Sequence, residues 1–495
     1  MLKNRNLIKK VAYYSTLLII ILISFRVYSS IYYPGLNSDN AVTVLMVHYF
    51  NLPADLYFWG QDRMGSIIPL IAQIPNKIFC LSALYSEAIA HYLILVIGFF
   101  ALAPFFKTNF ARILFALMLF LPPAKEIEIT QLTLSIQYMF LFIGIYMILK
   151  VRTDCNNFKQ HVFLLLSVLS MVIAVWDSDL AIVSVFIFIF LYLIYLIKDT
   201  SIKLLIRNIV PYYIMCGILL GFLFISFAKS TSPVKNNYAL LSNPNEILDT
   251  LSIFYNTLKD IFLFNIKETL TTVYSYLALF TLALMMFFVR KVKFSSKITK
   301  RLFVFFILDL FAVFTVILIS KWTLMNGVPM RYFNCTYISA VIIILLLFEN
   351  LKINNIKLNI VKYSLLLTVL TGSIGAIYTQ IFVWYKPYKP YKPYSEYVSE
   401  LDKLGNIGII GDYWNSYICS INKPDIIKAT PHDQSCVRNM SIVDEVFKQK
   451  KIYLIKDMWL DSYPDTIVQF GRTLVKIEEP FTMANATLCK YKVVP

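Results

Sequence analysis

The sequence predicts a mainly α-helical, polytopic membrane protein with about eleven spanning helices and a small α/β domain at its C-terminal end. Apolar residues make up 58% of the chain and charged residues only 15%, and the mean hydropathy is +0.65. These values lie far from those of a soluble protein. The apolar residues also gather in nearly uncharged segments, most of them long enough to cross a hydrocarbon core. These segments are 12–31, 88–106, 162–176, 180–197, 209–227, 270–289, 302–319, 335–348 and 365–384.

Two further apolar segments are shorter or interrupted. Residues 113–121 end at Pro122 and Pro123, and residues 134–149 follow a polar turn. Both lie between polar turns, so we count both as spans. The predicted total is therefore eleven.

The net charge of +17 comes from lysines and arginines in short loops that alternate along the chain, such as 150–159, 198–207, 290–301 and 352–362. This is the positive-inside pattern of membrane proteins. It predicts a bilayer rather than a nucleic acid as the partner, and a cytoplasmic N-terminus. With an odd number of spans, the C-terminus lies outside.

Three outside segments are long, namely 32–86, 229–268 and the tail 385–495, so we expect a membrane domain over 1–384 and an extracytoplasmic domain over 385–495. Within the first loop, the apolar stretches 41–49 and 67–78 are too short to span but suit helices in the membrane interface. Between them, residues 57–66 form a polar, aromatic run with two glycines.

The tail begins with three Tyr-Lys-Pro copies over 385–393, which favour an extended spacer. Beyond it, 407–410 and 451–455 are typical of buried strands, with a helix expected over 443–450. This alternation predicts the small α/β domain. An outside location also permits a Cys419–Cys436 disulfide, whereas the sequence contains no CxxC spacing that would indicate structural zinc.

Asp39 is the first candidate for chemistry, because it follows the first span by only a few residues and begins an interfacial helix. Two interpretations stay open from the residues alone. Ser38 or Asp39 could be an ordinary helix N-cap. Alternatively, the Asp39 carboxylate could accept a proton from a hydroxyl nucleophile as a general base.

An acidic residue just after the first span, an amphipathic first loop and the Gly-Gln-x-x-Met-Gly-Ser run resemble the GT-C glycosyltransferase superfamily. Segments 37–46 and 57–66 are most similar to bacterial serotype-converting O-antigen glucosyltransferases. The resemblance implies an inner-membrane enzyme that transfers one sugar, such as glucose, from a polyprenyl phosphate to an envelope glycan such as lipopolysaccharide O-antigen. It implies no certain cofactor, although a divalent metal is compatible with it.

The resemblance also implies roles for individual residues. Asp39 corresponds to the catalytic acidic residue, and Glu126 and Glu128 are the candidates for a second one. The Arg331-Tyr332 pair resembles an Arg-Tyr motif that would meet the leaving phosphate. Arg63 is a second candidate for that contact.

Substrate contacts are expected from three segments near the outer face. The candidates are Trp59, Gln61, Asp62, Asp177, Asp179, Tyr413 and Trp414. Burial of Trp414 in the small domain is the alternative for that residue. A transporter or flippase, or a polysaccharide polymerase or ligase that handles lipid-linked glycans, is the alternative for the whole chain.

Overall fold

The computed structural model describes residues 2–123, 135–151, 157–199, 208–235, 240–378 and 394–494. Contacts divide the chain into two compact units. The first comprises Met1–Phe25, Leu93–Phe227 and Asn237–Pro387, and the second comprises Arg26–Tyr92, Ala228–Asn236 and Tyr388–Pro495. The loop 32–86, which is predicted to lie outside, thus belongs to the same unit as the C-terminal domain.

Long apolar helices build the first unit. Within the described residues, nine helices are long and apolar enough to cross a membrane, and the two shorter ones, α5 and α6, coincide with the two weaker predicted spans. The helical membrane fold is therefore confirmed, while the total of eleven spans and their orientation stay predictions. The long elements are α1 (Leu2–Tyr28), α4 (Ala83–Leu102), α5 (Asn109–Phe120), α6 (Ile136–Leu149), α7 (Phe158–Asp177), α8 (Ala181–Asp199), α10 (Ile209–Thr231), α11 (Pro244–Phe262), α12 (Thr269–Phe287), α13 (Lys297–Ile319), α15 (Asn334–Asn350) and α16 (Asn355–Tyr378).

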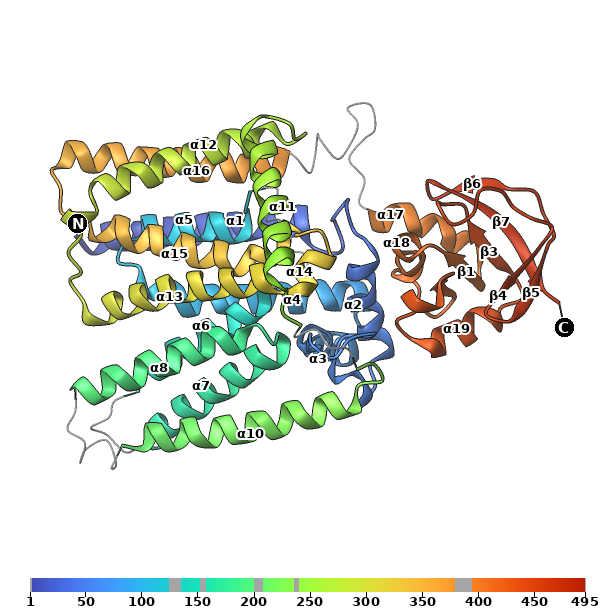
Figure 1. Ribbon diagram of the computed structural model, residues 1–495, viewed down its shortest axis with the longest axis horizontal. Coiled ribbons are helices and arrows are strands. Elements are labelled where there is room, and N and C mark those ends of the chain that lie inside the picture. The colour runs from blue at the N-terminus through green and yellow to red at the C-terminus, as the bar shows by residue number, and fades with distance from the viewer. Residues whose placement is uncertain are drawn as a thin grey trace. The chain divides into compact units, whose positions relative to one another are not determined.

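Three helix pairs pack along their lengths, namely α6 with α7, α12 with α16 and α13 with α15 (Figure 1). Glycines allow some of these close approaches: a Cβ added at Gly372 of α16 would lie 2.9 Å from the Tyr274 ring of α12. Small residues at helix contacts are typical of membrane bundles. Inside the bundle, the buried Asp309 carboxylate accepts hydrogen bonds from Tyr138 at 2.5 Å and from Ser339 at 2.8 Å.

The loop 32–86 contains the two expected short helices. They are α2 (Ser38–Tyr49) and α3 (Ile67–Gln73), the latter extended by a π-helical turn over Ile74–Ile78. Helix α2 begins three residues earlier than the apolar pattern alone indicates. The reason is a polar cap at Asn37, which satisfies the first backbone N–H groups.

The C-terminal domain contains one mixed, seven-stranded sheet, shown in red in Figure 1. Its strand order is β2-β1-β3-β7-β5-β4, with β6 paired to β7. Strands β2, β1 and β3 are parallel, and the other pairs are antiparallel. The elements are α17 (Tyr394–Val398), β1 (Ile407–Gly411), α18 (Tyr413–Ser416), β2 (Ile427–Pro431), α19 (Met440–Phe447), β3 (Ile452–Ile455), β4 (Thr466–Gln469), β5 (Arg472–Lys476), β6 (Phe481–Met483) and β7 (Ala486–Val493).

Both predicted strands and the α/β character of this domain are confirmed by β1 and β3. The predicted helix over 443–450 is displaced: α19 begins at Met440, because the Asn439 side chain caps it by accepting a hydrogen bond from the Ser441 N–H at 3.0 Å. The Cys419–Cys436 disulfide is not formed. Both cysteines are free thiols, and Cys419 donates instead to the Asn415 carbonyl at 3.1 Å.

Candidate functional site

Asp39 does not cap helix α2. The Asn37 side chain accepts hydrogen bonds from the backbone N–H groups of Asp39 at 3.0 Å and Asn40 at 3.3 Å. The Asn40 side chain accepts in return from the Asn37 N–H at 3.3 Å, which completes a capping box. The interpretation of Ser38 or Asp39 as the N-cap is therefore wrong, and the Asp39 carboxylate is left available for other contacts.

The partner of this carboxylate comes from the C-terminal domain. The Tyr413 hydroxyl, at the start of α18, donates a hydrogen bond of 2.5 Å to Asp39 Oδ1. Burial raises the pKa of the Tyr413 phenol well above its usual range, and the nearby Asp39 charge raises it further. The phenol therefore stays protonated and acts as a donor, so residues 374 positions apart meet in one site.

Two carboxylates, Asp412 and Asp457, fix the short helix α18 that carries Tyr413. Asp412, directly after β1, accepts a hydrogen bond from the Asn415 N–H at 2.8 Å and so caps α18. The Asn415 side chain donates in turn to Asp457, which follows β3. Burial raises the pKa of Asp412, and the Asp457 charge adds to the increase. These contacts tie the turn after β1 to the loop after β3.

Arg438, in the loop between β2 and α19, is the site residue that the sequence analysis missed. Its Nε donates to the Tyr413 hydroxyl at 3.3 Å, and its guanidinium carbon lies 4.9 Å from the Tyr413 ring centroid. Its backbone N–H donates to the Tyr417 hydroxyl at 2.7 Å. Nothing in the local sequence singles this arginine out, because only the fold brings it beside Tyr413.

The polar run 57–66 contacts Arg438 through Gly60. This glycine has a φ of +76°, and a Cβ there would lie 2.8 Å from Arg438 Cδ. A side chain at this position would therefore both strain the backbone and displace the arginine.

The side chains of the run mostly support the loop. Trp59 is buried and donates to Asp55 Oδ1 at 2.8 Å, which gives its indole a local structural partner. Arg63 Nε donates to Gln61 Oε1 at 3.2 Å, and the half-buried Asp62 lies between these two residues.

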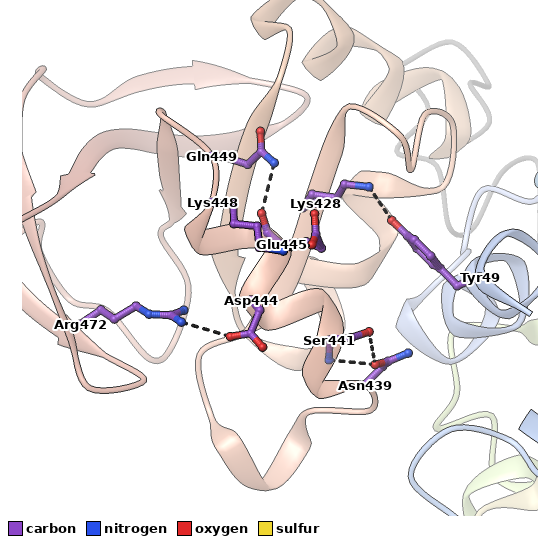
Figure 2. A network of polar contacts seen from close by, with 9 residues as sticks. All are labelled: Tyr49, Lys428, Asn439, Ser441, Asp444, Glu445, Lys448, Gln449 and Arg472. Atoms are coloured by element: carbon purple, nitrogen blue, oxygen red, sulfur yellow. Dashed lines mark hydrogen bonds and ion pairs between the residues drawn. The ribbon is translucent and has the colours of Figure 1, made fainter. Parts of the chain in front are cut away.

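The far end of α2 is also attached to the C-terminal domain. Lys428 of β2 donates to the Tyr49 hydroxyl at 2.8 Å (Figure 2). It also donates to the Pro424 carbonyl at 2.6 Å. Burial lowers the pKa of Lys428. Together with the Asp39–Tyr413 bond, this contact holds both ends of α2 against the domain.

Trp414 is 49% exposed, so the alternative interpretation, its burial in the domain core, is wrong. The residue lies at the start of the short helix α18, whose inward position is taken by Ser416. Its ring contacts that of Tyr413 edge-on, with ring centroids 5.1 Å apart. An exposed aromatic face thus lies next to the Asp39–Tyr413 pair.

The remaining candidates belong to the first unit. Arg331 and Tyr332 lie in the 3-10 turn Met330–Phe333 before α15, where the Tyr332 hydroxyl accepts from the Trp322 indole at 3.0 Å. Asp177 ends α7 fully buried, and within the described residues neither of its carboxylate oxygens accepts a hydrogen bond. Asp179, in the turn that follows, is half-buried.

Several predicted features lie outside the described residues, namely Glu126, Glu128 and the Tyr-Lys-Pro copies of 385–393. Among the residues that the structure does describe, no group of three or more His, Cys, Asp or Glu side chains could hold a metal ion.

No protein-family model and no curated protein matches the sequence. Solved structures do match. ArnT from Cupriavidus metallidurans superposes with a TM-score of 0.57 in the apo state and 0.59 when bound to undecaprenyl phosphate. The alignments cover 97% of this chain and 97% of ArnT, at 9% and 8% identity.

The chain shares the fold of ArnT. The fold class expected from the sequence resemblance is therefore confirmed over nearly the whole chain. The archaeal oligosaccharyltransferase AglB from Archaeoglobus fulgidus is also similar, with a TM-score of 0.48 and 11% identity over 90% of this chain and 70% of its own. The finer likeness to serotype-converting glucosyltransferases stays a prediction.

Proposed function

We propose that this chain is a membrane glycosyltransferase that moves a single hexose, such as glucose, from a polyprenyl phosphate to an envelope glycan. The reaction would take place at the outer face of the bacterial inner membrane, with Asp39 as general base. The observation that carries the proposal is the Asp39 carboxylate itself. It is freed from capping by Asn37 and oriented by the Tyr413 hydroxyl at 2.5 Å.

In the proposed reaction, the acceptor hydroxyl oxygen attacks the anomeric carbon while Asp39 takes its proton. The bond between the anomeric carbon and the phosphate oxygen breaks, and the polyprenyl phosphate leaves with the electron pair. A single in-line displacement of this kind inverts the anomeric configuration. Arg331 and Arg63 are the candidates to meet the negative charge of the leaving phosphate, because a guanidinium can make paired hydrogen bonds to it.

The similarity of fold to ArnT, whose structure was determined with bound undecaprenyl phosphate, supports the choice of a lipid-linked donor. A C-terminal domain that contributes Tyr413 to the site of the first loop favours a transferase over a flippase. A flippase has no need for a soluble domain that orients a carboxylate.

The test is mass analysis of envelope glycans from cells that express the wild type, Asp39→Asn or Asp444→Asn. Asp444 of α19 is the matched control, since it pairs with Arg472 of β5 at 3.1 Å (Figure 2). Among the described residues, no hydrogen bond or ion pair joins the Asp444 carboxylate to a candidate site residue. We expect a one-hexose increment with the wild type and Asp444→Asn, and none with Asp39→Asn. A full increment with normally expressed Asp39→Asn would end the assignment of Asp39 as base.

The same cells also separate the alternatives. Chains extended by many residues would indicate a polymerase, and movement of intact lipid-linked sugar across liposomes without a new glycosidic bond would indicate a flippase. Activity retained in a chelator would exclude a required divalent metal.

A further inference from the structure

The three parallel strands of the C-terminal domain end at one edge of the sheet. Strand β1 lies between β2 and β3, so the connection from β1 to β2 and the connection from β2 to β3 run in opposite directions along the sheet. Open α/β sheets bind ligands beyond the carboxyl ends of their strands at such a reversal of strand order. The loops that follow β1, β2 and β3 carry Tyr413, Arg438 and Trp459 respectively.

Aromatic faces line these loops. Trp414 is 49% exposed, and His432, directly after β2, stacks on Trp459 with centroids 4.4 Å apart and planes 10° from parallel. Both rings of this stack are half-exposed. Flat aromatic side chains with an exposed face and a polar edge suit the apolar faces and hydroxyls of sugars.

Arg438 brings a positive charge to this edge. Among the described residues it forms no ion pair with Asp39, and only its Nε donates a side-chain hydrogen bond, to Tyr413. Within the described part of the chain, its two terminal nitrogens have no hydrogen-bond acceptor. A guanidinium fixed on one side by Tyr413 and Gly60 is preorganised to bind a carboxylate or phosphate with its free nitrogens.

We propose that Arg438 binds an anionic substituent of the acceptor glycan, a carboxylate or a phosphate monoester, next to the hydroxyl that Asp39 deprotonates. The loops after β1, β2 and β3 then form the acceptor subsite. This inference rests on the proposed function and adds the chemical class of its acceptor.

Geometry assigns the anion to the acceptor rather than to the donor. Asp39 and Arg438 contact the same Tyr413 hydroxyl, so the guanidinium lies on the side of the general base. In an in-line displacement the leaving phosphate departs on the opposite side of the anomeric carbon from the attacking hydroxyl. Arg438, which lies beside the general base Asp39, is therefore positioned to bind an anionic group of the attacking acceptor.

The test uses the full-length protein in lipid nanodiscs and saturation-transfer NMR with two probes, methyl β-D-glucuronide and methyl β-D-glucoside. The probes differ only by a carboxylate in place of a hydroxymethyl group. We expect the wild type to bind the glucuronide about tenfold more tightly, as one charge-assisted contact provides. Arg438→Gln should abolish this preference, and Arg438→Lys should retain part of it.

Arg472→Gln is the matched control, because Arg472 of β5 pairs with Asp444 and should leave the preference unchanged (Figure 2). Inorganic phosphate should displace the glucuronide from the wild type. Equal binding of the two probes by the wild type, or a preference that survives Arg438→Gln, would overturn the inference.

Failure of this inference is distinguishable from failure of the proposed function. If Asp39→Asn still transfers sugar while the glucuronide preference depends on Arg438, the anion site stands and the base assignment falls. If Asp39→Asn is inactive and neither probe is preferred, the transferase stands and the acceptor class falls.

Discussion

Replacing Tyr413 by phenylalanine isolates the contact on which the proposed site depends. The substitution keeps the ring beside Trp414 and removes only the hydroxyl, which donates to Asp39 at 2.5 Å and accepts from Arg438 at 3.3 Å. Asp39 would lose the donor that orients its carboxylate, and Arg438 would lose the acceptor that fixes its Nε.

The size of the effect follows from the kind of hydrogen bond. A bond to a charged group contributes about 1.5–3 kcal/mol, and each ~1.4 kcal/mol changes a rate about tenfold. Both partners are half-buried, so solvent weakens the contact and we use the lower part of this range. We expect Tyr413→Phe to lower the rate of transfer about 10- to 30-fold.

The assay is single-turnover transfer from a radiolabelled polyprenyl-phosphate sugar, with Tyr463→Phe as the control. The Tyr463 hydroxyl donates to the Thr487 carbonyl at 2.6 Å elsewhere in the domain, so its loss tests for a general effect of removing a tyrosine hydroxyl. Wild-type transfer by Tyr413→Phe would refute the reasoning. Faster transfer would show instead that the phenol competes with the acceptor for Asp39.

Three further predictions concern the scaffold of the site. In a transfer assay of both variants, Gly60→Ala should lower the rate of transfer more than Gly405→Ala. Both glycines have a φ above +70°, but only a Cβ at Gly60 would meet a neighbour, Arg438 Cδ at 2.8 Å. Lys428→Ala should lower the melting temperature by removing a buried donor, a loss of about 1–3 kcal/mol that differential scanning fluorimetry would detect. Asp412→Asn should raise the melting temperature at pH 7 and leave it unchanged at pH 3.5. The folded-state pKa of Asp412 is raised by burial and by Asp457, so the cost of its charge is present above that pKa and disappears as pH falls below the unfolded value near 3.8.

Much of the fold follows from local sequence. Apolar segment length alone predicts the membrane helices, because a backbone in lipid must satisfy its hydrogen bonds within each segment. The strands over 407–410 and 451–455 also follow from short apolar runs. Errors occur where polar side chains compete for backbone groups. Asn37 and Asn439, rather than the apolar pattern, decide where α2 and α19 begin.

For the candidate site, too, part follows from the sequence and part from the tertiary structure. The sequence by itself determined that Asp39 stands at the start of a short helix after the first span, and that Tyr413 follows a strand. Only the tertiary structure decided that these two residues share a hydrogen bond and that Arg438 and Gly60 complete the group. The physical reason is that such contacts depend on how the sheet and helix α2 pack, which involves residues hundreds of positions apart. No local pattern encodes the partner of a side chain at that separation.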